Sequence, residues 1–228
     1  LTLMNLRTLE NLNFINVEIG YHSGFRLSPD KRKIVFPEIW DDEKNLWITQ
    51  VWDLETEKLL YILDFSSDVT KVDFSPNGKY FISADKDGYI RIHDLETGNT
   101  VKQMDFTAQV EDVDFVSTDT FIAGYYQGQV RLWSLNTEEV VGSFEGNTDW
   151  GNVVSISPNQ KLIAAKQDNS TVRVWEIETG SLISTINCPD KKAMDSMLFA
   201  KDSKAVLVEC GNSLDTHSVT AWDLESQK

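Results

Sequence analysis

Short runs rich in apolar residues, separated by polar turns, follow one another along most of the chain, and their apolar residues are not confined to one face of the expected strands. Four examples, all rich in β-branched or aromatic residues, are KYFIS (79–83), YIRIHDL (89–95), TVKQMDF (100–106) and TVRVWEI (171–177). Short runs of this composition, bounded by turns, are typical of β-strands. No long window shows the period of three to four that an amphipathic helix needs. The pattern therefore predicts an all-β protein made of short strands.

One phrase at the end of such a strand occurs five times. Its versions are QVWDLETEKLL, RIHDLETGNTV, RLWSLNTEEVV, RVWEIETGSLI and TAWDLESQK, which start at residues 50, 91, 131, 173 and 220. Aligned on the Trp or His of each phrase, successive copies lie 41, 40, 42 and 47 residues apart. An enzyme needs its nucleophile or base only once, whereas a period of this length is typical of repeat architectures. The phrase therefore indicates a structural repeat.

A second phrase keeps the same period and joins two strands through a polar turn. Its versions are RLSPDKRKIVF (26–36), DFSPNGKYFIS (73–83), DFVSTDTFIAG (114–124), SISPNQKLIAA (155–165) and LFAKDSKAVLV (198–208). Tight turns are also expected at KDG (86–88), at QG (127–128) and DN (168–169) in the same slot, and at ETG (96–98, 178–180). Each unit thus holds about four strands. The repeats are approximately 1–53, 54–94, 95–135, 136–176 and 177–228, within one domain over 1–228.

The unit SPNGKYFISADKDGYIRIHDLETG (75–98) resembles a WD40 repeat, and the pattern covers almost the whole chain. The resemblance implies a β-propeller, in which four-stranded antiparallel blades pack both faces on their neighbours. The positions that match the repeat are Trp52, Asp53, Asp87, His93, Asp94, Trp133, Asp168, Trp175, Trp222 and Asp223. The family's Gly-His pair at the start of the inner strand is absent from every unit, and Ser134 replaces the Asp of the third. We therefore expect weaker polar links between strands than in the family at large.

The two ends of the chain are complementary half-blades. LRTLEN (6–11) resembles an outer strand without its Trp-Asp, and AWDLESQK (221–228) lacks the outer strand that should follow. Five blades closed by the two ends would leave no strand edge unpaired, and unpaired edges are a liability. The alternative is that the chain is five blades of a larger ring. We favour the closed unit of five.

Charge and cysteine content restrict the function. The 228 residues hold 21 Lys and Arg against 36 Asp and Glu, a net charge of −15, which disfavours nucleic acid as a partner. The chain has no stretch of 18 apolar residues, so we expect no membrane span. Cys188 and Cys210 are too few for a zinc site, so we expect two free thiols, no metal and no cofactor. These features predict a cytoplasmic protein.

No enzyme signature is present. The chain has no nucleotide-binding Gly-rich loop, no GxSxG elbow and no HExxH motif. His93 occupies the Trp slot of a repeat, which predicts a structural role, and His22 and His217 lie in expected loops. We therefore expect no catalytic residues.

Departures from the period are the best candidates for function, because insertions in repeat proteins collect on faces that often bind. They are expected loops at PEIWDDEKNLW (37–47), EGNTDWGN (145–152) and ECGNSLDTHS (209–218), the first and last side by side if the ring closes. Their aromatic and charged residues are candidate partner contacts: Trp40, Asp41, Asp42, Glu43, Trp47, Asp149, Trp150 and His217.

Two functions follow from these features. The first is a non-catalytic protein-interaction scaffold that binds a protein or peptide on its loop-rich face. The acidic run 41–43 favours a basic partner by charge complementarity. The alternative is a ligand-sensing or regulatory propeller domain of a longer protein.

Overall fold

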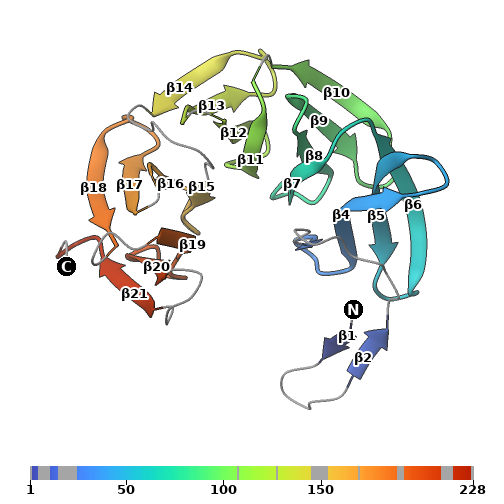
Figure 1. The fold of residues 1–228 in the computed structure, drawn as a ribbon, viewed down its shortest axis with the longest axis horizontal. Helices are drawn as coiled ribbons and strands as arrows, with labels where there is room; N and C mark the ends of the chain where they lie inside the picture. Colours follow the sequence, from blue (N-terminus) through green and yellow to red (C-terminus); the bar gives the residue numbers. More distant parts are fainter. Residues whose placement is uncertain are drawn as a thin grey trace. The chain divides into compact units, whose positions relative to one another are not determined.

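The computed structural model is built from β-strands (Figure 1). It describes residues 2–4, 11–14, 25–106, 108–126, 128–144, 154–168, 170–188, 193–211 and 218–226. No helix occurs in these ranges, so none of them contains a helix that would cross a membrane. The chain divides into two compact units, residues 1–107 and 108–228.

The first unit contains two four-stranded antiparallel sheets and a separate hairpin. The hairpin pairs β1 (Thr2–Met4) with β2 (Asn11–Phe14). The first sheet runs in the order β3 (Arg26–Leu27), β4 (Lys33–Asp41), β5 (Leu46–Asp53) and β6 (Lys58–Phe65). The second runs in the order β7 (Val69–Phe74), β8 (Tyr80–Asp85), β9 (Tyr89–Asp94) and β10 (Thr100–Asp105). Residues 5–10, which include most of the expected outer strand LRTLEN, lie outside the described part.

The second unit contains three sheets of the same plan. The first sheet consists of β11 (Val110–Phe115), β12 (Thr120–Tyr125), β13 (Val130–Ser134) and β14 (Val140–Phe144). The second consists of β15 (Val154–Ile156), β16 (Leu162–Lys166), β17 (Thr171–Glu176) and β18 (Leu182–Asn187). The last sheet has three strands among the described residues: β19 (Ala193–Phe199), β20 (Ala205–Gly211) and β21 (Ser218–Asp223). The first strands β11, β15 and β19 of the three sheets are spatial neighbours. The five sheets confirm the predicted blades of a WD40-type propeller.

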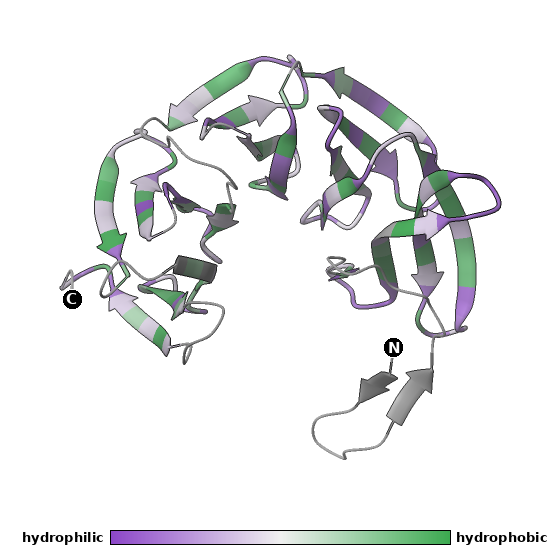
Figure 2. Ribbon diagram, in the orientation of Figure 1, coloured by the Kyte–Doolittle hydropathy of each residue, from purple (hydrophilic) through white to green (hydrophobic). Residues whose placement is uncertain are grey.

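The β15–β18 sheet is apolar on both faces because each face packs on a neighbouring sheet. On β16, Ile163 and Ala165 join the cluster shared with the preceding sheet, whereas Ala164 between them joins the cluster shared with the following one. Alternate residues of one strand therefore enter two different cores. Figure 2 shows that hydrophobic residues lie mainly on the strands and that the turns are largely hydrophilic.

A serine closes the turn between the first two strands in three of the sheets. The hydroxyls of Ser28, Ser75 and Ser157 donate to the Asp or Asn two residues later, at 2.6–2.8 Å, and each accepts the backbone N–H five residues later at 2.9 Å. All three serines are buried, so every lone pair and proton of the hydroxyl needs such a partner. This hydrogen bonding explains why the SP-[DN] phrase recurs with the period.

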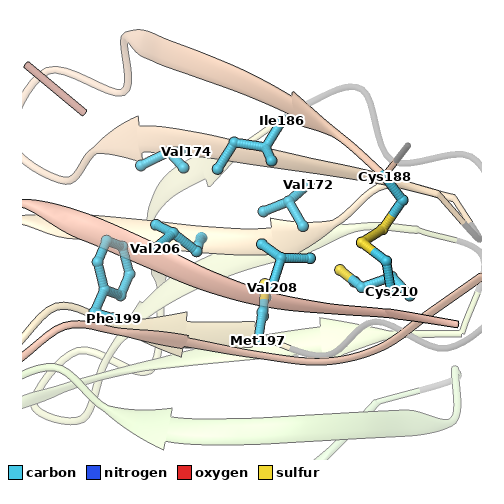
Figure 3. Packing of buried hydrophobic residues seen from close by; sticks show 11 residues of the cluster. Val172, Val174, Ile186, Cys188, Met197, Phe199, Val206, Val208 and Cys210 are labelled. Atoms are coloured by element: carbon cyan, nitrogen blue, oxygen red, sulfur yellow. A yellow bond between two sulfur atoms is a disulfide. The ribbon is translucent and has the colours of Figure 1, made fainter. Parts of the chain in front are cut away.

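The prediction of two free thiols was wrong. Cys188, just after β18, and Cys210, in β20, form a disulfide across two neighbouring sheets, with their Cα atoms 5.7 Å apart (Figure 3). A separation of 22 residues carries no information about proximity. The two cysteines meet because the outer strand of one sheet packs against the middle strand of the next.

Candidate functional site

The segment 37–47, expected as a loop, is the end of a long β-hairpin. β4 continues to Asp41 and β5 begins at Leu46, which leaves a turn of four residues. The sequence did not predict this strand because Pro37 interrupts its pattern. In the structure, the pairing of β4 with β5 shifts register between Phe36 and Ile39. A β-bulge is one of the few places where a strand tolerates proline. The insertion therefore projects two paired strands and a tight turn instead of a loop.

Asp41 holds the turn at the hairpin tip. One of its carboxylate oxygens, Oδ1, accepts the backbone N–H of Glu43 and of Lys44, both at 3.0 Å. Its carbonyl accepts the N–H of Asn45 at 2.8 Å, and Asn45 has the positive φ of 54° that asparagine tolerates well. Because its carboxylate is used inside the turn, Asp41 has a structural role among the candidate contacts.

Trp40 and Trp47 face each other across the hairpin. They are paired in register, and their rings meet edge to face with centroids 5.2 Å apart and planes at 66°. The Trp40 indole N–H donates to Asp42 Oδ1 at 2.9 Å, which fixes the orientation of the ring. Trp47 packs on the buried cluster that contains Val51 and Phe65, but Trp40 remains 44% exposed. The hairpin thus presents a preoriented aromatic side chain to solvent.

The acidic charge of the tip is only partly neutralised within the chain. Lys44 Nζ lies 2.8 Å from Asp64 Oδ1 in β6, and this hydrogen bond raises the pKa of Lys44. The sequence pattern did not reveal Asp64 as a neighbour of the tip, because it lies 20 residues further along in a different strand. Lys44 is paired with Asp64, whereas Asp42, which accepts the Trp40 indole N–H, and Glu43 are exposed in the same turn.

The other candidate contacts are in segments 145–152 and 209–218. Asp149, Trp150 and His217 lie outside the described residues, as does the whole of the segment 145–152. In the segment 209–218, residues 209–211 belong to β20 and Ser218 begins β21. The candidate site is therefore the tip of the β4–β5 hairpin.

The Asp that follows the repeat Trp or His caps the next turn. Asp53 and Asp94 each accept the backbone N–H groups two and three residues later and the hydroxyl of Thr56 or Thr97, and Asp223 accepts the N–H of Ser226. These hydrogen bonds lower the pKa of all three carboxyls. In the hairpin slots, Asp168 accepts the N–H and hydroxyl of Ser170, while Asp87 is exposed. Each contact lies within a turn, which is a structural role.

The Trp slots are filled by packing side chains. Trp175 is buried beside Phe144, and Trp52, Trp133 and Trp222 are partly buried. His93 in the same slot is buried and stacks on Phe81, with ring centroids 4.6 Å apart. Its Nε2 lies 2.9 Å from Ser83 Oγ and its Nδ1 3.1 Å from Thr100 Oγ1. Burial, helped by nearby Arg91, lowers the pKa of His93 to about 3, so the ring is neutral.

No metal site accompanies the hairpin. In the part of the chain that the structure describes, no three His, Cys, Asp or Glu side chains gather in a way that would hold an ion. What the tip offers is an oriented aromatic surface beside negative charge. That arrangement suits recognition.

Comparison with known proteins identifies the repeats. The sequence model of the family described as "WD domain, G-beta repeat" matches residues 57–94 and 138–176. Each match begins at or just before an outer strand and ends at the third strand of the following sheet, β6 to β9 and β14 to β17.

Several curated proteins are similar over part of the chain. Periodic tryptophan protein 2 of Arabidopsis thaliana is 30% identical over 101 residues, 44% of this chain and 11% of that protein. Small ribosomal subunit protein RACK1y of Oryza sativa subsp. japonica is 27% identical over 108 residues, 47% of this chain and 30% of its own length. Eukaryotic translation initiation factor 3 subunit I of Neurospora crassa is 27% identical over 79 residues, which are 35% of this chain and 22% of that protein. The matches span less than a third of each relative.

The repeat motifs, the blade-like sheets and these matches agree with one another. Residues 57–94 and 138–176 are therefore WD40 repeats, and the chain is similar to WD-repeat proteins over these parts.

Proposed function

We propose that this chain is a non-catalytic protein-interaction scaffold whose β4–β5 hairpin tip contacts a basic segment of a protein partner. The observation that carries the proposal is Trp40, which is 44% exposed yet held in one orientation. Aromatic side chains dominate binding energy at protein interfaces because they bury large areas at a low entropic cost. Trp47 behind the ring and Asp42 at its N–H have already restricted its motion.

Charge specifies the kind of partner. Asp42 and Glu43 are exposed beside Trp40, and the whole chain carries a net charge of −15. Complementary charge accelerates association and orients the partner, and an indole face also attracts Lys or Arg. A peptide with a basic residue next to an apolar one fits this tip. Nucleic acid and anionic membrane surfaces do not fit it.

The relatives support a role in an assembly. Two of them are named as a small ribosomal subunit protein and as a subunit of eukaryotic translation initiation factor 3. Membership of a complex requires protein contacts, and a cytoplasmic location is part of the proposal. Whether as a closed ring of five or as five blades of a larger ring, the chain would act as a rigid support for the tip.

Paired variants test the contact. Trp40→Ala removes the exposed ring, and Glu43→Lys reverses a charge that no described contact holds in the turn. Asp41 is left intact because its carboxylate holds the turn. Val141→Ala in β14 is the matched control, since Val141 is 56% exposed and belongs to a different sheet.

The readout is quantitative capture of partners from a cell extract by wild type and each variant, with thermal melts to confirm folding. We expect at least one protein captured by wild type and by Val141→Ala to be depleted more than tenfold by both hairpin variants, as loss of a hot spot predicts. Equal capture by all four proteins would contradict the proposal. So would a thermal shift with small metabolites and no captured protein, which would favour a ligand-sensing domain.

A further inference from the structure

The disulfide links two sheets at the end of the second unit. Cys188 follows the outer strand β18, and Cys210 lies in β20, the middle strand of the last described sheet. Both residues belong to the apolar cluster between these sheets, with Val172, Val174 and Ile186 on one side and Val206 and Val208 on the other (Figure 3). The loop that the bond closes contains all of β19 and most of β20.

Polar contacts also join the same two sheets. The N–H of Asn159 donates to Ser203 Oγ at 3.0 Å, and Lys166 Nζ donates to the carbonyl of Met194 at 3.0 Å. An apolar cluster with side chains from both sheets packs between them. The disulfide is therefore the one covalent constraint on how the last sheet sits against its neighbour, among the described residues.

Most side chains of β21 are exposed. In β21, Val219 is 69% exposed. Val172, at the corresponding position of β17, is only 1% exposed because the next sheet covers it. Regions with few buried apolar contacts open locally at a lower free-energy cost than the rest of a domain. The sheet β19–β21 therefore depends more on the disulfide than a sheet covered on both faces.

We propose that Cys188 and Cys210 form a redox-controlled latch, which holds the β19–β21 sheet on its neighbour when oxidised and allows that sheet to open when reduced. Reduction by a dithiol breaks the S–S bond and forms two protein thiols. The dithiol supplies both electrons and both protons and becomes a disulfide itself. Both sulfurs are buried, so exchange follows transient opening of the sheet and is slow. The latch is independent of the hairpin contact.

Hydrogen exchange on the full chain tests this proposal without any mutation. Peptides from 193–211 and 218–226 report on β19–β21, and peptides from 69–105 in the first unit serve as the internal control. The chain is compared after treatment with oxidised glutathione, after reduction with dithiothreitol, and after reoxidation. Alkylation under native and denaturing conditions counts the free thiols in each sample.

We expect the oxidised chain to show no free thiol and the reduced chain to show two. Reduction should accelerate exchange in β19–β21 roughly 100-fold, since a cross-link of this loop size suppresses opening by about that factor, and reoxidation should reverse it. Exchange in 69–105 should stay constant. The double variant Cys188→Ser/Cys210→Ser should match the reduced chain and ignore dithiothreitol.

Three outcomes would overturn the latch. One is two free thiols after treatment with oxidised glutathione, which would show that the bond does not form. Another is exchange in β19–β21 that does not change on reduction. The third is equal acceleration in 69–105, which would show a global stabiliser instead of a local latch.

Discussion

His93 shows how one residue can take the place of another in a repeat. Four phrases carry Trp at this position, and the second carries His. The imidazole ring stacks on Phe81 as an aromatic side chain would, while its two nitrogens meet the hydroxyls of Ser83 and Thr100. The substitution preserves the packing of the repeat and adds two polar contacts. It also introduces a group whose charge depends on pH.

We predict that His93 makes the protein less stable in mild acid. Its folded-state pKa is about 3, against about 6.5 in the unfolded chain, so only the unfolded state gains a proton between these values. The free energy of unfolding should be independent of this group above pH 6.5. It should fall by up to about 1.4 kcal/mol per pH unit as pH decreases towards 3. Urea unfolding at pH 7 and pH 5 measures the loss.

His93→Gln is the matched variant for this prediction. It keeps polar atoms near Ser83 and cannot titrate in this range, so it should lose less stability between pH 7 and pH 5 than wild type. Equal losses in both proteins would show that other groups cause the acid sensitivity.

Thr49 is a polar residue in an apolar position. It lies three residues before Trp52, the position that Ile90 has in β9 and Val172 has in β17, and it is fully buried. Its hydroxyl has no hydrogen-bond partner among the described residues. Thr49→Val should therefore raise the free energy of unfolding by about 1 kcal/mol, because an unsatisfied buried hydroxyl is replaced by a methyl group of similar size. A lower urea midpoint for the variant would reveal a hidden partner.

At the scale of elements, the turn between the third and fourth strands repeats with the same backbone but with different residues. Glu57, Gly98, Glu138 and Gly180 occupy one position in four turns, all with positive φ. Gly98 differs from Gly180 in its surroundings. A Cβ on Gly98 would lie 2.8 Å from Cδ2 of Tyr61, whereas a Cβ on Gly180 would have no neighbouring atom within 4 Å. Tyr61 is itself fixed by the 2.7 Å hydrogen bond that its hydroxyl donates to the Leu95 carbonyl.

We predict different costs for two alanine substitutions in these turns. Gly180→Ala should destabilise the protein by about 1 kcal/mol, the usual cost of positive φ for a non-glycine residue. Gly98→Ala should cost about 1–3 kcal/mol more, because it also displaces the Tyr61 ring. Urea midpoints of the two variants measure the difference. Equal midpoints would show that the ring moves aside freely.

The sequence predicted the elements best where a period supported them. The strands and the SP turns recur, so each copy strengthens the prediction for the others. The extension of the β4–β5 hairpin is not repeated in the other described sheets. Because Pro37 interrupts the strand pattern there, the sequence predicted a loop. The contacts of Asp41 within the turn and of Lys44 with Asp64 depend on three-dimensional pairing, and no local pattern encodes them.

At the scale of the whole molecule, the repeat period predicted the blades correctly and the contacts between them only in outline. Two-sided apolar strands indicated that sheets pack on both faces, and the clusters on either side of β16 confirm this. The disulfide was missed because it depends on how β18 and β20 meet, which neither cysteine spacing nor charge reveals. Closure of five blades into one ring stays a prediction.

The central claim is that the hairpin tip contacts a basic protein segment, and site-specific photo-crosslinking tests it most directly. A photoreactive phenylalanine derivative is placed at position 43, and in a matched protein at position 141 of β14, in full-length chains exposed to a cell extract. We predict crosslinks from position 43 to peptides rich in Lys or Arg, absent from position 141 and abolished by Trp40→Ala. Identical crosslinks from both positions, or crosslinks from position 43 that survive Trp40→Ala, would contradict the account.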